Sequence, residues 1–167
     1  MNLRARLLRS AETLGELETV RHERFEDGVK LATCGHRTAS AYLLGYVAEM
    51  TLKCAFFRLW GYADTEPIGV QNLRTADVLS RGFGVDKPPE SFHSPIYWAQ
   101  AVDGLRNEFG RPLDLYTSRE LNARAECVWS CWVVSMRYRL NRLTEGEFRR
   151  LYEATEWIRT QYDRLWR

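Results

Sequence analysis

The fold is decided by the segment AYLLGYVAEMTLK, residues 41–53. Apolar and aromatic residues recur in it every three or four positions, which is the period of a helix with a buried face. The same spacing continues on both sides, so we predict one long helix over residues 37–60. Gly45 in the middle of such a helix costs about 1 kcal/mol relative to alanine. We therefore expect another helix to pack closely against it.

Helical patterns also cover most of the chain on either side of this segment. Two pairs with the spacing of a capping box, Thr117 with Glu120 and Thr144 with Glu147, mark helix starts. A serine followed by proline, at residues 94–95, marks another. The further predicted helices are 3–17, 25–32, 73–80, 94–110, 117–140 and 144–165, with loops at 61–69 and 82–93.

Strand signals are nearly absent, because no alternating β-branched run and no Asn-Gly hairpin turn between two such runs occurs. The sequence thus predicts an all-α fold in which residues 1–167 form one domain. We expect an up-and-down bundle of four to five main helices with a short inserted helix. At least about 60% of residues should then be helical, which is twice the usual fraction.

The composition limits the classes of protein. A chain of 167 residues with 45% hydrophobic residues supports one substantial core. A net charge of +2 argues against coating nucleic acid by bulk charge. There is no apolar run near the roughly 20 residues of a membrane span and no secretory signal at the N-terminus, so we expect a cytoplasmic protein without membrane contact. The four cysteines are Cys34, Cys54, Cys127 and Cys131, and none of them form a CxxC pair. We therefore expect no metal site and no cofactor.

Three segments carry a resemblance to a known family. Residues 41–53 resemble the helix signature of HEPN domains (higher eukaryote and prokaryote nucleotide-binding), which have a similar Ala-Tyr-Leu, Gly-Tyr, Glu and Leu-Lys pattern. Residues 24–37 are similar to the first helix and turn of that family, and residues 132–138, WVVSMRY, resemble its later Arg-Tyr element. The resemblance implies a helical bundle, commonly a homodimer, that acts on RNA or works beside a nucleotidyltransferase-type partner.

Ribonuclease members of this family use an arginine, a short polar spacer and a histidine. Arg137 matches the arginine, but no histidine follows His93 anywhere in the chain. An arginine cannot replace the missing proton donor, because its pKa exceeds about 12. We therefore expect the standard ribonuclease mechanism to be absent.

A group of cations follows the Arg-Tyr element. Residues 137–150 contain five arginines against two acidic residues. Arginine binds phosphate through two hydrogen bonds and stacks on bases. The residues proposed to contact a nucleotide or RNA are Arg137, Tyr138, Arg139 and Arg142. The alternative is an ordinary solvated helix corner.

Glu49 and Lys53 are four residues apart, in the favourable order for a helical ion pair. Since Glu49 follows an aromatic helix face, we predict that it is at least half buried. We expect it to contact an arginine or a tyrosine hydroxyl, with Arg137 and Tyr138 favoured. Glu49 and Lys53 are thus a predicted structural polar pair.

Three functions remain open. The first is a non-catalytic HEPN-like module that binds RNA, a nucleotide or a protein partner. The second is a toxin-type ribonuclease in which folding brings His36 or His93 near Arg137. The third is a structural interaction domain that assembles through exposed tryptophans, among Trp60, Trp98 and Trp166. A histidine at a site shared with Arg137 would favour the enzyme.

Overall fold

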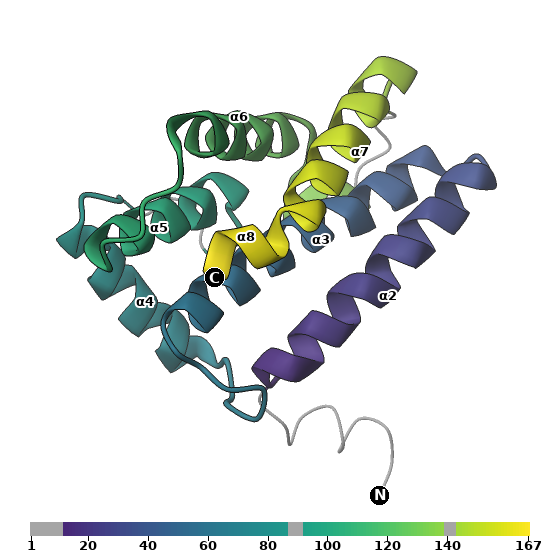
Figure 1. The fold of residues 1–167 in the computed structure, drawn as a ribbon. Coiled ribbons are helices and arrows are strands. Elements are labelled where there is room, and N and C mark those ends of the chain that lie inside the picture. The colour runs from purple at the N-terminus through teal and green to yellow at the C-terminus, as the bar shows by residue number, and fades with distance from the viewer. Residues whose placement is uncertain (1–11, 87–91, 139–142) are drawn as a thin grey trace, which may run out of the picture.

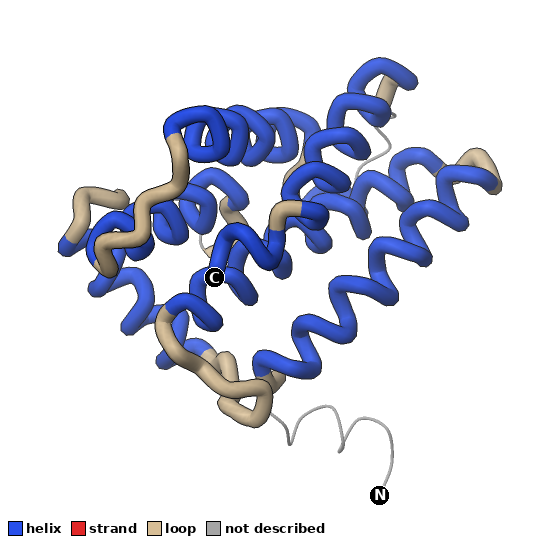
Figure 2. The backbone as a smooth tube through the Cα atoms, in the orientation of Figure 1, coloured by secondary structure: helices blue, strands red, loops and turns tan. Residues whose placement is uncertain are grey.

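The computed structural model describes residues 12–86, 92–138 and 143–167 (Figure 1). Of these residues 77% are helical, and their only β-type pairing is an isolated bridge between Thr13 and Pro67. The predicted all-α bundle is thereby confirmed. Figure 2 shows helices joined mostly by short loops and turns.

The helices are α2 (Leu14–Thr33), α3 (Arg37–Leu59), α4 (Val70–Gly82), α5 (Pro95–Glu108), α6 (Leu115–Cys131), the 3-10 helix η1 (Val134–Tyr138), α7 (Glu145–Thr160) and α8 (Tyr162–Trp166). Helix α3 is the centre of the bundle, because it contacts α2, α5, α6, α7, α8 and η1. Most of its residues are buried from Ala41 to Phe57. The segment that predicts the fold is therefore also the segment around which the other helices except α4 pack (Figure 1).

Several predicted helix boundaries are confirmed. Thr144 and Glu147 form the capping box at the start of α7. Ser94 caps α5, accepting a hydrogen bond from the Tyr97 amide, and Pro95 occupies the first turn. Gly110 follows α5 with a φ of 65°, a left-handed conformation that glycine adopts without a steric penalty. These boundaries depend on neighbouring residues alone.

Other boundaries differ from the prediction. Helix α6 begins after Asp114, which caps it, so the expected start at Thr117 is wrong. It ends at Cys131 and does not continue to residue 140. At the N-terminal side the chain is helical without a break from Leu14 to Thr33, whereas two helices were expected. The C-terminal helix is divided at Gln161 into α7 and α8.

Trp132 explains the end of α6. Its backbone is extended, with φ −135° and ψ 134°, and its indole lies against Gly45 of α3. The indole Nε1 donates a 3.0 Å hydrogen bond to the carbonyl oxygen of Tyr42. Gly45 thus admits a close neighbour, as expected, but that neighbour is a side chain and not a helix.

The three tryptophans proposed to mediate assembly are buried to different degrees. Trp98 is fully buried, and Trp60 and Trp166 are partly buried and pack against the core. The apolar surface that these side chains bury is already removed from water within the monomer. Trp98 is therefore not available for assembly, whereas Trp60 and Trp166 keep part of their surface exposed.

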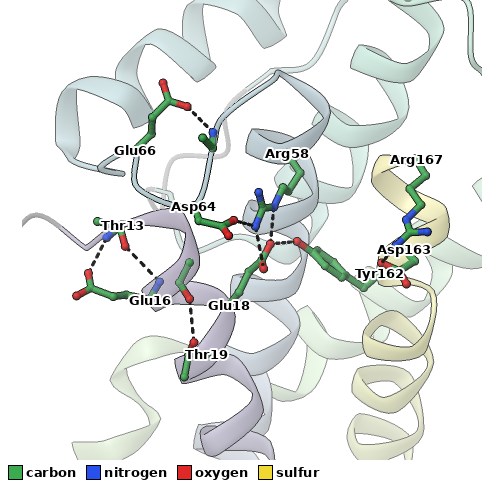
Figure 3. A network of polar contacts seen from close by, with 12 residues as sticks. Thr13, Glu16, Glu18, Thr19, Arg58, Asp64, Glu66, Tyr162, Asp163 and Arg167 are labelled. Carbon is green, nitrogen blue, oxygen red and sulfur yellow. Dashed lines mark hydrogen bonds and ion pairs between the residues drawn. The ribbon is translucent and has the colours of Figure 1, made fainter.

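A polar network joins α2, α3 and α8 at one end of the bundle (Figure 3). Arg58 donates to both carboxylate oxygens of Glu18, at 2.7 and 3.1 Å, and also pairs with Asp64. The Tyr162 hydroxyl donates to the same Glu18 carboxylate. Burial alone would raise the pKa of Glu18, but the hydrogen bonds from Arg58 and Tyr162 outweigh it and lower that pKa. Every member of the network has a partner, so we assign it a structural role.

Candidate functional site

The buried carboxylate of Glu49 is the centre of the candidate site. Glu49 is only 2% exposed, and it forms an ion pair with Lys53 one turn later on α3. His93 approaches from the other side, with its Nδ1 atom 3.1 Å from each carboxylate oxygen. The prediction that Glu49 is buried is confirmed. Its described partners are Lys53 and His93. The favoured partners, Arg137 and Tyr138, have side chains outside the described part of the structure, so contact with them stays a prediction.

Neighbouring contacts hold His93 in this position. It directly precedes Ser94, the cap of α5. The Trp98 indole donates a 2.8 Å hydrogen bond to the carbonyl oxygen of Phe92. The ring of Tyr46 lies edge-on to the imidazole, with centroids 6.2 Å apart. The start of α5 therefore positions the imidazole against Glu49.

The two edges of the imidazole have different surroundings. Nδ1 lies against the buried carboxylate, yet the His93 side chain is 43% exposed. His93 helps to line a pocket of about 210 Å³, together with Trp129, Val133, Val134 and Ser135. A neutral imidazole that donates Nδ1–H to a carboxylate keeps its Nε2 lone pair free to accept a proton. The arrangement is that of a histidine oriented for acid–base chemistry.

A larger groove of about 860 Å³ lies at the turn between α2 and α3, at the end of the molecule opposite α4 (Figure 1). His36 and Arg37 line it from the start of α3, and Tyr42 lines it one turn later. Met136 and Leu143 line it from the other side. No acidic residue occurs among the described residues that line this groove.

The helix η1 lies between the pocket and the groove. Val134 and Ser135 line the pocket, and the next residue, Met136, lines the groove. The pocket and the groove are thus adjacent, because consecutive residues of η1 line them. His93 belongs to the pocket and His36 to the groove, so the structure assigns the two histidines to different sites.

The structure describes the backbone of two of the four predicted contact residues. Arg137 and Tyr138 belong to η1 by their backbone, which puts them within three residues of Ser135 in the pocket. Arg139 and Arg142 lie outside the described residues. The structure therefore brings the Arg-Tyr element beside the His93 pocket at the level of the backbone.

The contact between His93 and Glu49 was not predicted from the sequence. The two residues are 44 positions apart, and no local pattern links them. The sequence contains only an indirect sign of a role for His93: a residue immediately before a helix cap has a fixed backbone position. The partner across the bundle depends on how α5 packs against α3.

No group of three or more potential metal ligands comes together among the described histidine, cysteine and acidic residues. All four cysteines are free thiols. None of the described helices combines the length and the apolar character that a bilayer crossing demands.

No protein-family model matches the chain, and neither the curated proteins nor the solved structures contain a match. The HEPN resemblance therefore rests on the residue patterns of the sequence.

Proposed function

We propose that the chain acts on RNA, with His93 as the acid–base residue and Glu49 as the residue that positions it. The observation that carries the proposal is the buried Glu49 carboxylate within 3.1 Å of the His93 Nδ1 atom. A carboxylate in this position selects one imidazole tautomer and fixes the orientation of the ring. It leaves Nε2 on the side of the imidazole away from Glu49.

The proposed reaction uses the hydroxyl group that distinguishes RNA from DNA. The Nε2 atom of His93 accepts the proton of a ribose 2′-hydroxyl, and the 2′-oxygen attacks the adjacent phosphorus. The bond to the 5′-oxygen breaks, and that oxygen takes a proton from water. The products are a 2′,3′-cyclic phosphate and a 5′-hydroxyl end, and His93 returns its proton to solvent.

Arg137 is the proposed cation for the phosphate. Its support is the resemblance of residues 132–138 to an Arg-Tyr element, together with the position of η1 beside the pocket. A guanidinium stabilises the additional negative charge of a phosphorane-like transition state. His93 would thus replace the histidine that standard family members have after their arginine.

The second candidate function is binding of a nucleotide or RNA without cleavage. The observation that favours it is the groove at the α2–α3 turn, which has His36 and Arg37 in its lining and no acidic residue among the described lining residues. A volume of about 860 Å³ is within the usual range of ligand sites.

A cleavage assay distinguishes the two. Purified protein is incubated with a labelled single-stranded RNA, and the ends of the products are identified by mass spectrometry. We expect His93→Ala to reduce cleavage at least about a hundredfold, the usual contribution of a general base. His22→Ala, on the exposed face of α2, is the matched control and should cleave like the wild type.

Two results would contradict the ribonuclease proposal. If His93→Ala cleaves at the wild-type rate, the activity comes from another group or from a contaminant. If the wild-type protein binds RNA and leaves it intact, the non-catalytic function is the correct one.

The nucleotidyltransferase-type partner is proposed from the resemblance. The homodimer is proposed from the resemblance and from the six tryptophans and the apolar stripe of the last helix. Light scattering over a range of concentrations tests the homodimer, and a monomer mass that does not change with concentration would contradict it.

A further inference from the structure

The groove at the α2–α3 turn has two chemically different parts. His36 and Arg37 at the start of α3 provide nitrogen donors, and both are exposed. Leu31, Leu43 and Met136 provide apolar surface, and all three are partly exposed. A ligand that fills this groove must carry negative charge beside a flat or apolar body.

We propose that the groove is a subsite for one unpaired nucleotide of the RNA substrate, and that it selects single-stranded RNA. This inference rests on the proposed function. The base would lie against the apolar walls, and its phosphate would contact Arg37. Guanidinium groups bind phosphate through two hydrogen bonds, and base contacts of this kind are tolerant of sequence.

The size of the groove supports this occupant. A volume of about 860 Å³ accommodates a nucleotide, because sites for small molecules of this kind measure about 300–1,000 Å³. In a duplex the faces of each base are covered by stacking, so only an unpaired base can enter. The subsite thereby excludes duplex RNA.

The position of η1 connects this subsite with His93. Ser135 lines the His93 pocket, and Met136 lines the groove. Consecutive Cα atoms are about 3.8 Å apart. The two sites therefore meet at η1, and the proposal places one nucleotide of a strand in the groove and another part of the same strand at His93.

The experiment measures RNA binding in the His93→Ala background, where cleavage does not interfere. The probes are a fluorescein-labelled single-stranded RNA and the same strand annealed to its complement, followed by fluorescence anisotropy. We expect the single strand to bind at least about tenfold more tightly, which corresponds to 1.4 kcal/mol. Arg37→Glu should reduce its affinity by about the same factor, or more.

Two further variants test separately the positive charge of the groove and its open volume. Arg74→Glu makes the same charge change at an exposed position on α4, and it should alter the affinity less than twofold, since effects of this size need direct contact. Ala39→Trp fills the groove from an exposed position on α3, so it should weaken binding of the single strand without changing the net charge. Circular dichroism checks that both variants keep the helical fold.

The outcomes of this experiment and of the cleavage assay are independent. Equal affinity for single strand and duplex, or unchanged affinity in Ala39→Trp, would overturn the subsite even if His93 is required for cleavage. Weakened binding in both Arg37→Glu and Ala39→Trp, with Arg74→Glu unaffected, would support the subsite even if no cleavage occurs.

Discussion

The indole of Trp132 lies so close to Gly45 that a Cβ atom added to the glycine would be 2.1 Å from two indole carbon atoms. The contact fixes the chain between α6 and η1 on the surface of α3. Because Val133 and Val134 follow directly, it also sets the wall of the His93 pocket. A glycine in the central helix thus determines the geometry of the candidate site.

Gly45→Ala should destabilise the protein. Alanine normally stabilises a helix interior by about 1 kcal/mol relative to glycine, but overpacking a core costs about 1–3 kcal/mol. A clash at 2.1 Å cannot be relieved by a small rotation, so we expect a net loss of about 2 kcal/mol in the free energy of unfolding. Urea melts measure this change.

The matched control is Gly82→Ala, at the end of α4, where an added Cβ meets no atom within 4 Å. It should be neutral or slightly stabilising. If Gly45→Ala is as stable as Gly82→Ala, the close packing of Trp132 on α3 is wrong.

Removing either charged group of the Glu49–Lys53 ion pair alone should lower the free energy of unfolding. Lys53→Met leaves a carboxylate that is 2% exposed with His93 as its remaining described partner, and removing one member of a buried pair costs about 3 kcal/mol or more. Glu49→Gln should also be costly, because it leaves the Lys53 ammonium without a counter-charge. Denaturant melts of the single variants measure both effects.

The double variant Glu49→Leu with Lys53→Met tests the origin of these costs. Replacing a buried ion pair by apolar side chains is often close to neutral. We expect the double variant to be more stable than either Lys53→Met or Glu49→Leu alone. Additive losses would show that the two side chains act independently.

Glu18 should make the stability of the protein depend on acid pH. Hydrogen bonds from Arg58 and Tyr162 outweigh burial and hold the pKa of Glu18 below its ordinary value of 4.5. A lowered pKa in the folded state gives stability that is present above pH 4.5 and lost as the pH falls through the folded-state pKa. We therefore expect stability to decrease below about pH 4.5.

Urea melts between pH 7 and pH 3 test the role of Glu18. Glu18→Gln should be less stable than the wild type at pH 7, and the difference should shrink as the pH falls. Glu23→Gln, at an exposed position on the same helix, should leave the pH profile unchanged. An acid profile identical in the wild type and Glu18→Gln would remove Glu18 as its cause.

The cysteines should differ in reactivity. Cys54 is buried, and burial raises the pKa of its thiol to about 12, so little thiolate forms at neutral pH. Cys34 is exposed. With iodoacetamide at pH 8, mass spectrometry should find rapid modification of Cys34 and modification of Cys54 only after unfolding. Equal rates for both thiols in the native protein would contradict the burial of Cys54.

Features that depend on neighbours within one or two helical turns could be predicted from the sequence. The period of residues 41–53 predicts the central helix, because a helix inside a bundle needs apolar residues every three or four positions. Thr144 with Glu147 and Ser94 with Pro95 predict helix starts, since a cap bonds to amides two or three residues away. The burial of Glu49 follows from its place on the helix face.

The packing of the helices sets where a helical pattern is interrupted and which distant residues meet. The apolar spacing continues past Trp132, yet α6 ends before it, because the indole bonds to a carbonyl 90 residues earlier and packs on Gly45. Likewise, no sequence pattern links His93 to Glu49, 44 residues away. The predicted contact of Glu49 with Arg137 or Tyr138 stays a prediction, because those two side chains lie outside the described part of the structure. The contacts of Trp132 and His93 both depend on how helices pack, and helical periodicity describes only one helix at a time.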